Sequence, residues 1–385
     1  MSAMGDPLSA ARGLRATIRA VRQETEQGRR LPPSVVQGLI DNGLCRMQVP
    51  ASLGGLEVDP LVALQVYEEL GAAEASVAWI AWNNALPALL SRHLPEAARA
   101  ELFSDGRRLF ANSTRPMGRA VVAEGGYRVS GRWSLVSGCE LAEWIPVMSI
   151  IIEGSAPRMM APGVPEMRMA YVPRGSYRIV DTWHVGGLRG TGSHDVVVED
   201  VFVPAERTFS FFDPVRIDRP LFQMPWVSTV GAWCAGICLG IARTATDTLL
   251  ELATSKSPVD PGPGLRDRPS VQAMVASSSA SLEAARLLLI DALGDVWATC
   301  SRGAASTEMQ RARLWGGTIH AVRTAKATVT SMYEAAGATA LYNECLIERA
   351  HRDIHAVTQH IVLAQSWMEE AGRVRLGLKP NHPFF

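Results

Sequence analysis

A glycine-rich turn that leads into a valine-rich segment lies near the middle of the chain and constrains its fold most strongly. The stretch 186–204 reads GGLRGTGSHDVVVEDVFVP. Glycine lets a backbone approach a ligand or a neighbouring segment closely, and a run of valines is typical of a buried strand. Since the sequence on both sides of this region favours helices, we predict a β-domain between two helical parts.

The first hundred residues have helical periodicity, and the character of the sequence then changes. Leu14, Ile18 and Val21 recur at helical spacing, and residues 61–102 are rich in alanine and leucine. Strand-like segments with glycine-containing turns begin near residue 109. These patterns predict a helical domain over 1–108 and a β-barrel or sandwich domain over 109–215.

Long apolar helices return after residue 215 and continue to the end of the chain. Four helices are expected, over 224–255, 270–301, 306–336 and 343–372. Long helices with short connections favour an antiparallel bundle. We therefore predict a C-terminal four-helix bundle over 216–385, and an α+β fold for the chain as a whole.

Composition excludes several classes of partner. The 385 residues contain 38 basic and 38 acidic side chains, so no net charge attracts nucleic acid or an anionic membrane. No uninterrupted apolar run reaches the ~18 residues of a membrane span, and the N-terminus has no apolar signal core. The six cysteines lack C-x-x-C pairing, which is typical of a reduced cytoplasmic protein. We expect a cytoplasmic protein that binds neither nucleic acid nor membrane.

Two pairs of residues have the spacing of metal ligands, but neither favours a metal. Cys234 and Cys238 are four apart in an apolar helix, which is the spacing of core residues. His351 and His355 are also four apart, yet no glutamate accompanies them and Arg352 would repel a cation. We expect no metal site.

The string 186–204 resembles the G-x-R-G-[ST] and V-x-V-P signature of the acyl-CoA dehydrogenase superfamily. The order of helical domain, β-domain and bundle is similar to the three-domain layout of that superfamily over essentially the whole chain. The resemblance implies a flavin bound between the β-domain and the helical domains, with Arg189 as a candidate cofactor contact. It also implies a homotetramer with flavin sites at subunit interfaces.

Two further segments resemble flavin-contacting motifs of the superfamily. The segment 133–144, WSLVSGCELAEW, is similar to the W-x-x-[ST]-[NS]-G motif that lies against the flavin ring, which implies cofactor contacts for Trp133, Ser137 and Gly138. A Ser-Gly turn between two strands is the alternative. Arg266 and Gln272 resemble part of a motif that reaches the flavin phosphates of a neighbouring subunit. The Phe-Gly of that motif is missing, which leaves FMN and FAD both open, and a solvated loop arginine is the alternative.

The base that acyl-CoA dehydrogenases use is missing. No acidic residue occurs between Asp353 and Glu369, or between Asp218 and Asp247. Abstraction of a weakly acidic carbon proton requires such a positioned base. The chain reads R-D-x-H-A-x-x-Q-H from Arg352 instead, which resembles flavin-dependent monooxygenases built on the same fold.

The monooxygenase resemblance assigns roles to two histidines and to a segment of the first domain. It implies that His360 faces flavin and substrate as an acid/base, while His355 orients the helix or the flavin pocket. Phenol hydroxylases of this group carry a second histidine after a Ser-Val-Ala-Trp-like segment, and here the corresponding residues are Trp82, Asn83 and Asn84. We expect these three to contact substrate, although helix capping would explain an asparagine equally well. Five tryptophans are candidates for the lining of an aromatic pocket, with a plain core position as the favoured alternative for each: Trp79, Trp82, Trp133, Trp144 and Trp226.

Together these resemblances predict the oxygenase component of a two-component flavin-dependent monooxygenase. A separate NAD(P)H:flavin reductase would supply reduced FMN or FAD, since no G-x-G-x-x-G nucleotide motif follows a strand. Oxygen would react at the flavin to give a C4a-hydroperoxide, which hydroxylates an aromatic or oxidises a heteroatom-containing small molecule. Ser137 would support the flavin and His360 would act as acid/base. The alternatives are an acyl-CoA dehydrogenase-type flavin dehydrogenase and a catalytically silent ligand-binding homologue.

Overall fold

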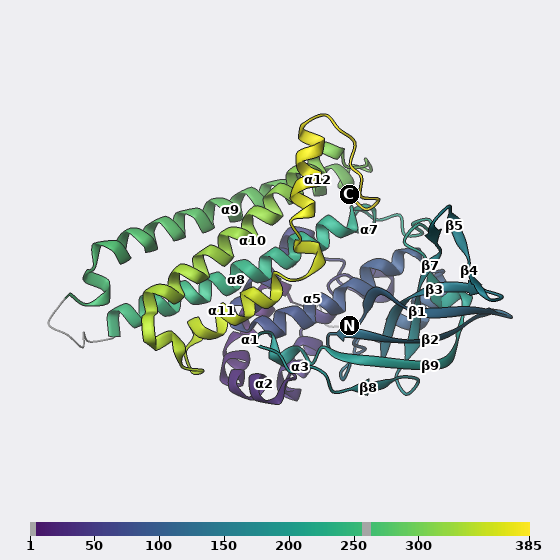
Figure 1. Cartoon of the computed structure of the whole chain (residues 1–385), viewed down its shortest axis with the longest axis horizontal. Coiled ribbons are helices and arrows are strands. Elements are labelled where there is room, and N and C mark those ends of the chain that lie inside the picture. The colour runs from purple at the N-terminus through teal and green to yellow at the C-terminus, as the bar shows by residue number, and fades with distance from the viewer. Residues whose placement is uncertain (1–4, 256–262) are drawn as a thin grey trace.

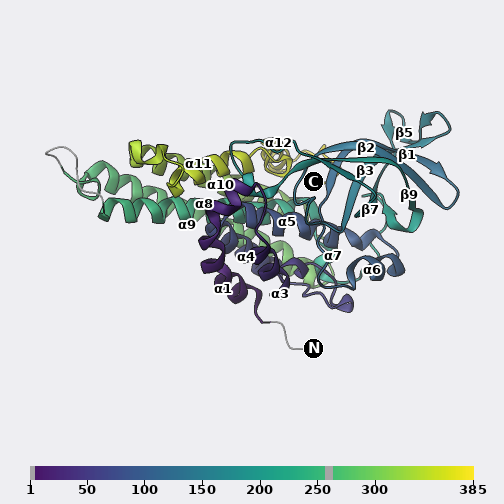
Figure 2. The same ribbon diagram turned by 90° about the horizontal axis from the view of Figure 1, so that it is seen from below.

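The structure is a computed structural model that describes residues 5–255 and 263–385. A helical part and a long helical bundle meet a β-sheet that lies at one end of the molecule (Figure 1). Seen from below, the N-terminal helices lie beside the bundle and next to the sheet (Figure 2). The N-terminal helices are α1 (Pro7–Ala20), α2 (Arg22–Gly28), α3 (Pro33–Asp41), α4 (Pro60–Ala73), α5 (Ala75–Leu90) and α6 (Glu96–Phe103).

The central part is a mixed eight-stranded sheet with a small separate hairpin. Its strands run in the order β10-β7-β3-β1-β2-β9-β8, with β4 paired to β3, and only β1 and β3 are parallel. The hairpin consists of β5 (Met159–Ala161) and β6 (Val164–Pro165). The strands of the sheet are β1 (Ser113–Ala123), β2 (Gly126–Val136), β3 (Trp144–Glu153), β4 (Ala156–Pro157), β7 (Met167–Pro173), β8 (Arg178–Val180), β9 (His194–Pro204) and β10 (Thr208–Phe209).

Three of the four long helices occur within a few residues of their predicted bounds. They are α8 (Trp226–Ser255), α9 (Pro269–Ser301) and α10 (Glu308–Ala336), and the short α7 (Pro220–Gln223) precedes them. With α11 (Leu346–Val357) they form the predicted bundle. The acyl-CoA dehydrogenase-like α+β fold, with a mixed sheet between helical N- and C-terminal parts along the chain, is confirmed.

The prediction of one continuous helix over 343–372 is wrong. The helix α11 ends at Val357, and α12 (Ser366–Arg375) begins only after a separate 3₁₀ turn at Ile361–Leu363. Side chains satisfy the backbone at this break, because the imidazole of His360 accepts the Val362 N–H and the indole of Trp367 donates to the Ile361 carbonyl. Local side-chain bonds therefore replace helical ones here.

The helices α8 and α9 are each long and apolar enough to cross a membrane, so the lack of an uninterrupted apolar run does not exclude a span. The apolar window of α8 is 89% buried within the fold, which accounts for its composition, whereas that of α9 is 11% buried. Glycines let α8 pack closely on α4. A Cβ atom at Gly240 would lie 2.2 Å from the Glu68 carbonyl oxygen and 2.6 Å from the Ala72 nitrogen.

Gly240→Ala should therefore destabilise the protein, because the clash is with backbone and the two helices would have to separate. We expect a loss of about 1–3 kcal/mol in the free energy of unfolding, measured by urea denaturation. Gly316→Ala on α10 is the matched control, since no atom lies within 4 Å of its added Cβ. That variant should gain roughly 0.5–1 kcal/mol from helix propensity. Equal stability of Gly240→Ala and the parent protein would contradict the close α4–α8 contact.

Candidate active site

Ser137 and His360, which are far apart in the sequence, meet at the indole of Trp79. Ser137 directly follows β2, Trp79 lies on α5, and His360 follows α11. The Trp79 Nε1–H donates to the Ser137 hydroxyl oxygen over 2.9 Å. The Trp79 ring contacts the His360 imidazole edge-on, with centroids 5.4 Å apart. One side chain of the first domain thus joins the residue after β2 to the segment after α11.

His360 sits in an aromatic surrounding that keeps it neutral. Its ring also meets Trp82 edge-on at 5.2 Å, and the two indoles lie 4.9 Å apart. Burial lowers the pKa of His360 to about 4, because an imidazolium ion would lose its hydration there. Its Nδ1 accepts the Val362 N–H over 3.3 Å, which places the hydrogen of the neutral ring on Nε2. Within residues 5–255 and 263–385, no hydrogen bond engages that Nε2.

Ser137 belongs to a buried row of three hydroxyl groups. Its Oγ lies 2.7 Å from the Ser193 Oγ, which in turn lies 2.6 Å from the Thr191 Oγ1. The Thr191 hydroxyl donates to the Leu188 carbonyl over 2.9 Å. Ser137, Ser193 and Thr191 are 6%, 3% and 2% exposed, so bulk water does not compete for these bonds.

The glycine-rich loop that supplies two of these hydroxyls packs against α2, α5 and α11. A Cβ at Gly187 would lie 2.3 Å from the Arg352 carbonyl oxygen of α11, and one at Gly190 would lie 2.3 Å from the Thr25 methyl of α2. Leu188 between them adopts a φ of 53°, a left-handed conformation that is unusual for leucine. Its N–H donates to the Asp353 carboxylate over 2.6 Å, which holds the loop in this strained conformation.

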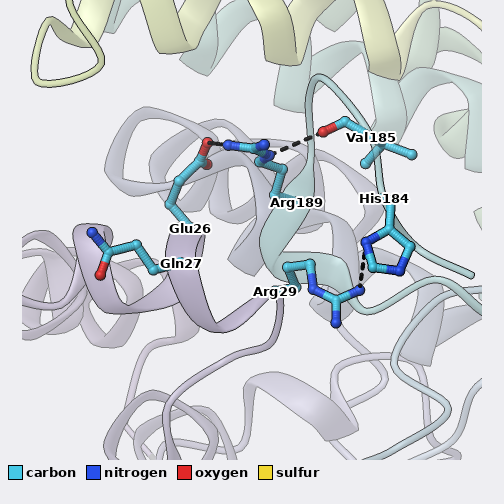
Figure 3. Close-up of a pocket in the computed structure, with 6 residues that line it drawn as sticks. All are labelled: Glu26, Gln27, Arg29, His184, Val185 and Arg189. Carbon is cyan, nitrogen blue, oxygen red and sulfur yellow. Dashed lines mark hydrogen bonds and ion pairs between the residues drawn. The ribbon is translucent and has the colours of Figure 1, made fainter. Parts of the chain in front are cut away.

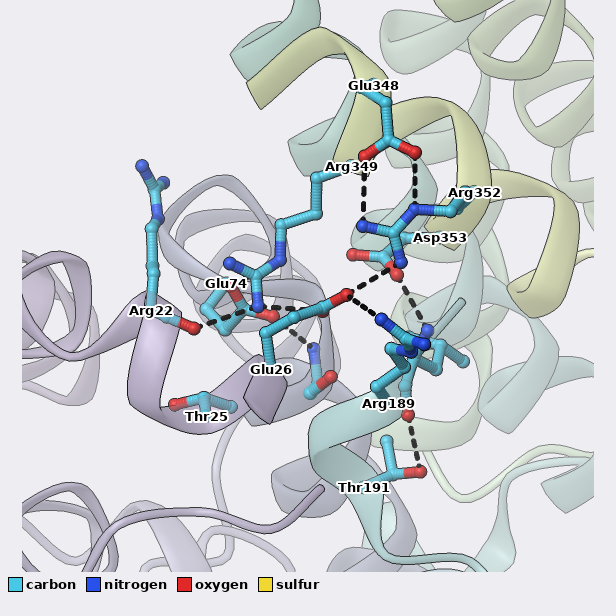
Figure 4. Close-up of polar contacts among 12 residues, drawn as sticks. Arg22, Thr25, Glu26, Glu74, Arg189, Thr191, Glu348, Arg349, Arg352 and Asp353 are labelled. Carbon is cyan, nitrogen blue, oxygen red and sulfur yellow. Dashed lines mark hydrogen bonds and ion pairs between the residues drawn. The ribbon is translucent and has the colours of Figure 1, made fainter. Parts of the chain in front are cut away.

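Charged residues from the loop, α2 and α11 form a network around Glu26 (Figure 4). The Glu26 carboxylate accepts from Arg189 at 3.2 Å, Arg352 at 2.8 Å and Arg349 at 3.0 Å. Arg349 also lies 3.4 Å from the Glu74 carboxylate. Burial raises the pKa of Asp353, and the nearby Glu74 carboxylate raises it further. The network joins parts of the chain that are about three hundred residues apart.

The other residues predicted on α5 have their polar atoms engaged within the protein. The Asn83 amide donates to the Ser137 carbonyl over 2.9 Å and accepts from Asn112. The Asn84 amide donates to the Cys45 carbonyl and accepts the Phe110 N–H, both over 2.8 Å. The Trp82 indole donates to the Val230 carbonyl of α8 over 3.0 Å. Asn83 therefore fixes the backbone of Ser137, and substrate contacts by these three residues remain predictions.

Trp133 and Gly138 lie on the sheet side of the site. Trp133 is fully buried in the core of the sheet, where its indole donates to the Met148 carbonyl over 2.7 Å. Gly138 has a φ of 75° and its N–H donates to the Thr191 carbonyl over 2.9 Å. The glycine thus gives the turn after β2 its left-handed backbone and ties it to the glycine-rich loop.

Arg189 lies on the opposite side of the loop from these hydroxyls. It lines an open cleft of 360 Å³ together with Glu26, Gln27, Arg29, His184 and Val185 (Figure 3). The guanidinium of Arg189 is held by Glu26 and by the Val185 carbonyl, and that of Arg29 by Asp181 at 2.6 and 2.7 Å. The cations of this cleft are therefore paired with groups of the chain itself, and a cofactor contact by Arg189 stays a prediction.

Arg266, Gln272 and His355 are not brought to Ser137 within one chain. Arg266 lies in the 3₁₀ turn Leu265–Asp267 just before α9, and Gln272 lies near the beginning of α9, which in Figure 1 is at the end of the bundle away from the sheet. The Gln272 amide donates to the Arg266 carbonyl over 3.0 Å. His355 lies on α11, where its Nδ1 is 2.7 Å from the His351 carbonyl oxygen. In the described residues, no group of three or more metal-ligating side chains gathers that could hold a metal ion.

Sequence reasoning gave no role in the site to Ser193 and Thr191, and it treated Trp79 as one of five tryptophans that line a pocket or belong to the core. The two hydroxyl residues stand within the glycine-rich string itself, at 191 and 193. Two hydroxyl side chains beside glycines in a buried loop are a usable signal, because buried hydroxyls need partners. Ser137, the partner of Ser193, is 56 residues away from it in the sequence, and only the fold reveals the contact.

The chain matches family models at both ends. Residues 9–104 match the acyl-CoA dehydrogenase N-terminal domain, and residues 232–365 match the acyl-CoA dehydrogenase C-terminal domain. Among curated relatives, the indole-3-acetate monooxygenase of Pseudomonas putida is 32% identical over 363 residues, which is 94% of this chain and 91% of the relative. The oxygenase component of the FADH2-dependent resorcinol hydroxylase of a Rhizobium species is 30% identical over 96% of this chain and 93% of the relative.

The fold agrees with these relatives. The crystal structure of the HsaA monooxygenase from Mycobacterium tuberculosis superposes with a TM-score of 0.90 at 29% identity, covering 99% of both chains. All three proteins are monooxygenases or hydroxylases by name. Of the functions that the sequence left open, the monooxygenase is the one that these relatives share. The chain therefore belongs to the acyl-CoA dehydrogenase superfamily, in the branch formed by the oxygenase components of flavin-dependent monooxygenases.

Proposed function

We propose that this protein inserts oxygen into an aromatic small molecule at the site between Trp79, Ser137 and His360. A hydroxyl, a neutral imidazole and two indoles from three parts of the chain converge there, and this convergence carries the proposal. Heteroatom oxidation of a similar molecule uses the same groups. The names of the relatives include an indole acetate and a resorcinol, and both are aromatic molecules that an indole-lined site suits.

The hydrogen-bonding groups at Ser137 fit a reduced flavin. The Ser137 oxygen has two polar neighbours, the Trp79 indole and the Ser193 hydroxyl, and a hydroxyl group can make a third hydrogen bond. We propose that Ser137 and the turn at Gly138 hold the flavin ring. A bound reduced flavin supplies the electrons that activate molecular oxygen. The site suits FMN and FAD alike, and a separate NAD(P)H:flavin reductase would deliver either in reduced form.

The proposed role of His360 is to exchange a proton with the substrate. At neutral pH the imidazole is uncharged, since burial lowers its pKa to about 4. In the structure Nε2 carries the hydrogen and can donate it to a substrate oxygen. The bond at Nδ1 is 3.3 Å long and therefore weak, so the ring can adopt the other tautomer, in which Nε2 accepts a substrate proton.

We further propose a homotetramer in the cytoplasm. The apolar window of α9 is only 11% buried in one chain, and Leu287 and Leu288 on it are 56% and 37% exposed. A second copy would cover such a surface, as oligomer interfaces do. The same helix begins just after Arg266 and carries Gln272, and the superfamily motif assigns both residues to a neighbouring flavin.

The cysteines support the proposed location in the cytoplasm. All six are free, which agrees with a reducing compartment.

Reduced flavin should bind more tightly than oxidised flavin. The reason is that the proposed enzyme must capture a cofactor reduced elsewhere. Anaerobic titration of the protein with reduced FMN and FADH2, and aerobic titration with the oxidised forms, would give the dissociation constants. Equal or tighter binding of the oxidised forms would argue against a two-component oxygenase.

His360→Ala should lower substrate oxygenation by about 10²- to 10⁴-fold, the usual contribution of a positioned acid or base. Reduced-flavin binding should change little, and oxygen consumption should continue with formation of hydrogen peroxide. Product yield and peroxide can be measured in the same assay. His355→Ala is the control, because the His355 ring is engaged by the His351 carbonyl on α11. This variant should lose less of its substrate oxygenation than His360→Ala. If His360→Ala keeps a normal product yield while His355→Ala loses its activity, the roles assigned to the two histidines are reversed.

Stability should fall as the pH drops from about 6.5 to 4. His360 binds a proton near pH 6.5 in the unfolded chain but only near pH 4 in the folded protein, so acid favours unfolding and the contribution is fully present above pH 6.5. A shift of this size is worth up to about 3 kcal/mol. His360→Asn should lose less stability between pH 7 and pH 4.5 in urea denaturation. An identical loss in variant and parent would show that the fold does not disfavour the charged form of His360.

A further inference from the structure

We propose that the hydroxyl row Ser137–Ser193–Thr191 selects the redox state of the flavin. It fixes Ser137 as a hydrogen-bond acceptor, which suits reduced flavin and disfavours oxidised flavin. Ser193 and Thr191 are then positioning residues that act through Ser137. The inference rests on the proposed contact between Ser137 and the flavin ring.

The direction of the hydrogen bonds follows from the end of the row at Leu188. A carbonyl oxygen only accepts, so the Thr191 hydroxyl must donate its one hydrogen to the Leu188 carbonyl, over 2.9 Å. Thr191 can then only accept from Ser193, which lies 2.6 Å away. Ser193 in turn has no hydrogen left, so it accepts from Ser137 over 2.7 Å. All three hydroxyl hydrogens therefore point toward Leu188.

The other end of the row is closed by an indole, which only donates. The Trp79 Nε1–H occupies one lone pair of the Ser137 oxygen at 2.9 Å. Ser137 has given its own hydrogen to Ser193, so one lone pair and no hydrogen remain for a ligand. Any further partner of this oxygen must be a hydrogen-bond donor.

Flavin changes the character of its ring nitrogen N5 with redox state. In reduced flavin N5 carries a hydrogen and donates, and in oxidised flavin it has none and accepts. The remaining lone pair of Ser137 matches the reduced form. With the oxidised form two acceptors would face each other, which is unfavourable at a position 6% exposed to water.

The direction is held by the backbone of the loop. The Leu188 carbonyl also accepts the Thr191 N–H at 3.1 Å and the Trp183 indole N–H at 3.1 Å, so it is fixed in place as an acceptor. The 2.6 Å bond from the Leu188 N–H to Asp353 fixes the peptide before Leu188, and the left-handed backbone of Leu188 then sets the direction of the following peptide, which carries the carbonyl. Reversing the row would break the bond from Thr191 to Leu188 without a replacement among the described groups.

Ser193→Ala tests the inference, because it removes the acceptor of the Ser137 hydrogen and lets Ser137 donate. The ratio of the dissociation constants of oxidised and reduced FMN should fall about tenfold, which is roughly the value of one hydrogen bond. Thr191→Val should lower the ratio in the same direction, since Ser193 is then free to donate to Ser137. Thr25→Val is the matched control. Its hydroxyl is buried beside the same loop but bonds the Val21 carbonyl of its own helix, and the ratio should not change.

The proposed flavin contact is tested separately with Ser137→Ala, which should weaken binding of reduced FMN and leave oxidised FMN nearly unaffected. If Ser137→Ala changes neither constant, the proposed contact itself fails. A second outcome would overturn redox selection by the hydroxyl row. In it, Ser137→Ala weakens the binding of reduced FMN, while folded Ser193→Ala and Thr191→Val keep the parental ratio of the two dissociation constants. Thermal melts establish that each variant is folded. If Ser193→Ala does not fold, the ratio measured for Thr191→Val decides whether the hydroxyl row selects the redox state.

Discussion

One hydrogen bond holds the site together, from the Leu188 N–H to the Asp353 carboxylate over 2.6 Å. It joins a loop of the central part to a helix of the bundle, and it crosses 165 residues of sequence. Leucine enters the left-handed region only at a cost in free energy, so this conformation needs a strong partner. The Leu188 carbonyl ends the hydroxyl row. The direction of the Ser137 hydroxyl therefore depends on the Asp353 carboxylate, although the two groups are not in contact.

The charge network around Glu26 acts on both ends of that row. Buried ion pairs gain little net free energy, since desolvation offsets their attraction, but they define geometry. Arg349 joins Glu26 to Glu74, and the Glu74 carboxylate caps α5 by accepting the Ser76 N–H at 3.4 Å. The same helix carries Trp79, the donor at the Ser137 end of the row. The network therefore places the indole and, through Asp353 on α11, the carbonyl.

Periodicity and turn residues were enough to predict the fold, because long apolar helices and valine-rich strands are local patterns. They failed at 343–372, where the ring of His360 and the indole of Trp367 bond to the backbone and end the helix. Motifs pointed to Ser137 and His360 as candidates, yet Trp79, which joins them, was only one of five tryptophans assigned to a pocket lining or to the core. Ser193 was missed because its partner is remote in sequence, and Arg266 lies at the far end of the bundle.

The neutral histidine also determines the electrostatics of the site. A carboxylate between Trp79 and Trp82 would have to be desolvated or protonated, since the indoles offer little compensation for a buried charge. A histidine in the same surrounding simply remains neutral, with a pKa of about 4. The groups in contact there are then two indoles, an imidazole and a hydroxyl, all uncharged at neutral pH. Hydrogen-bond direction, rather than charge, is left to discriminate between ligands, and a row of hydroxyls with one fixed direction supplies that discrimination.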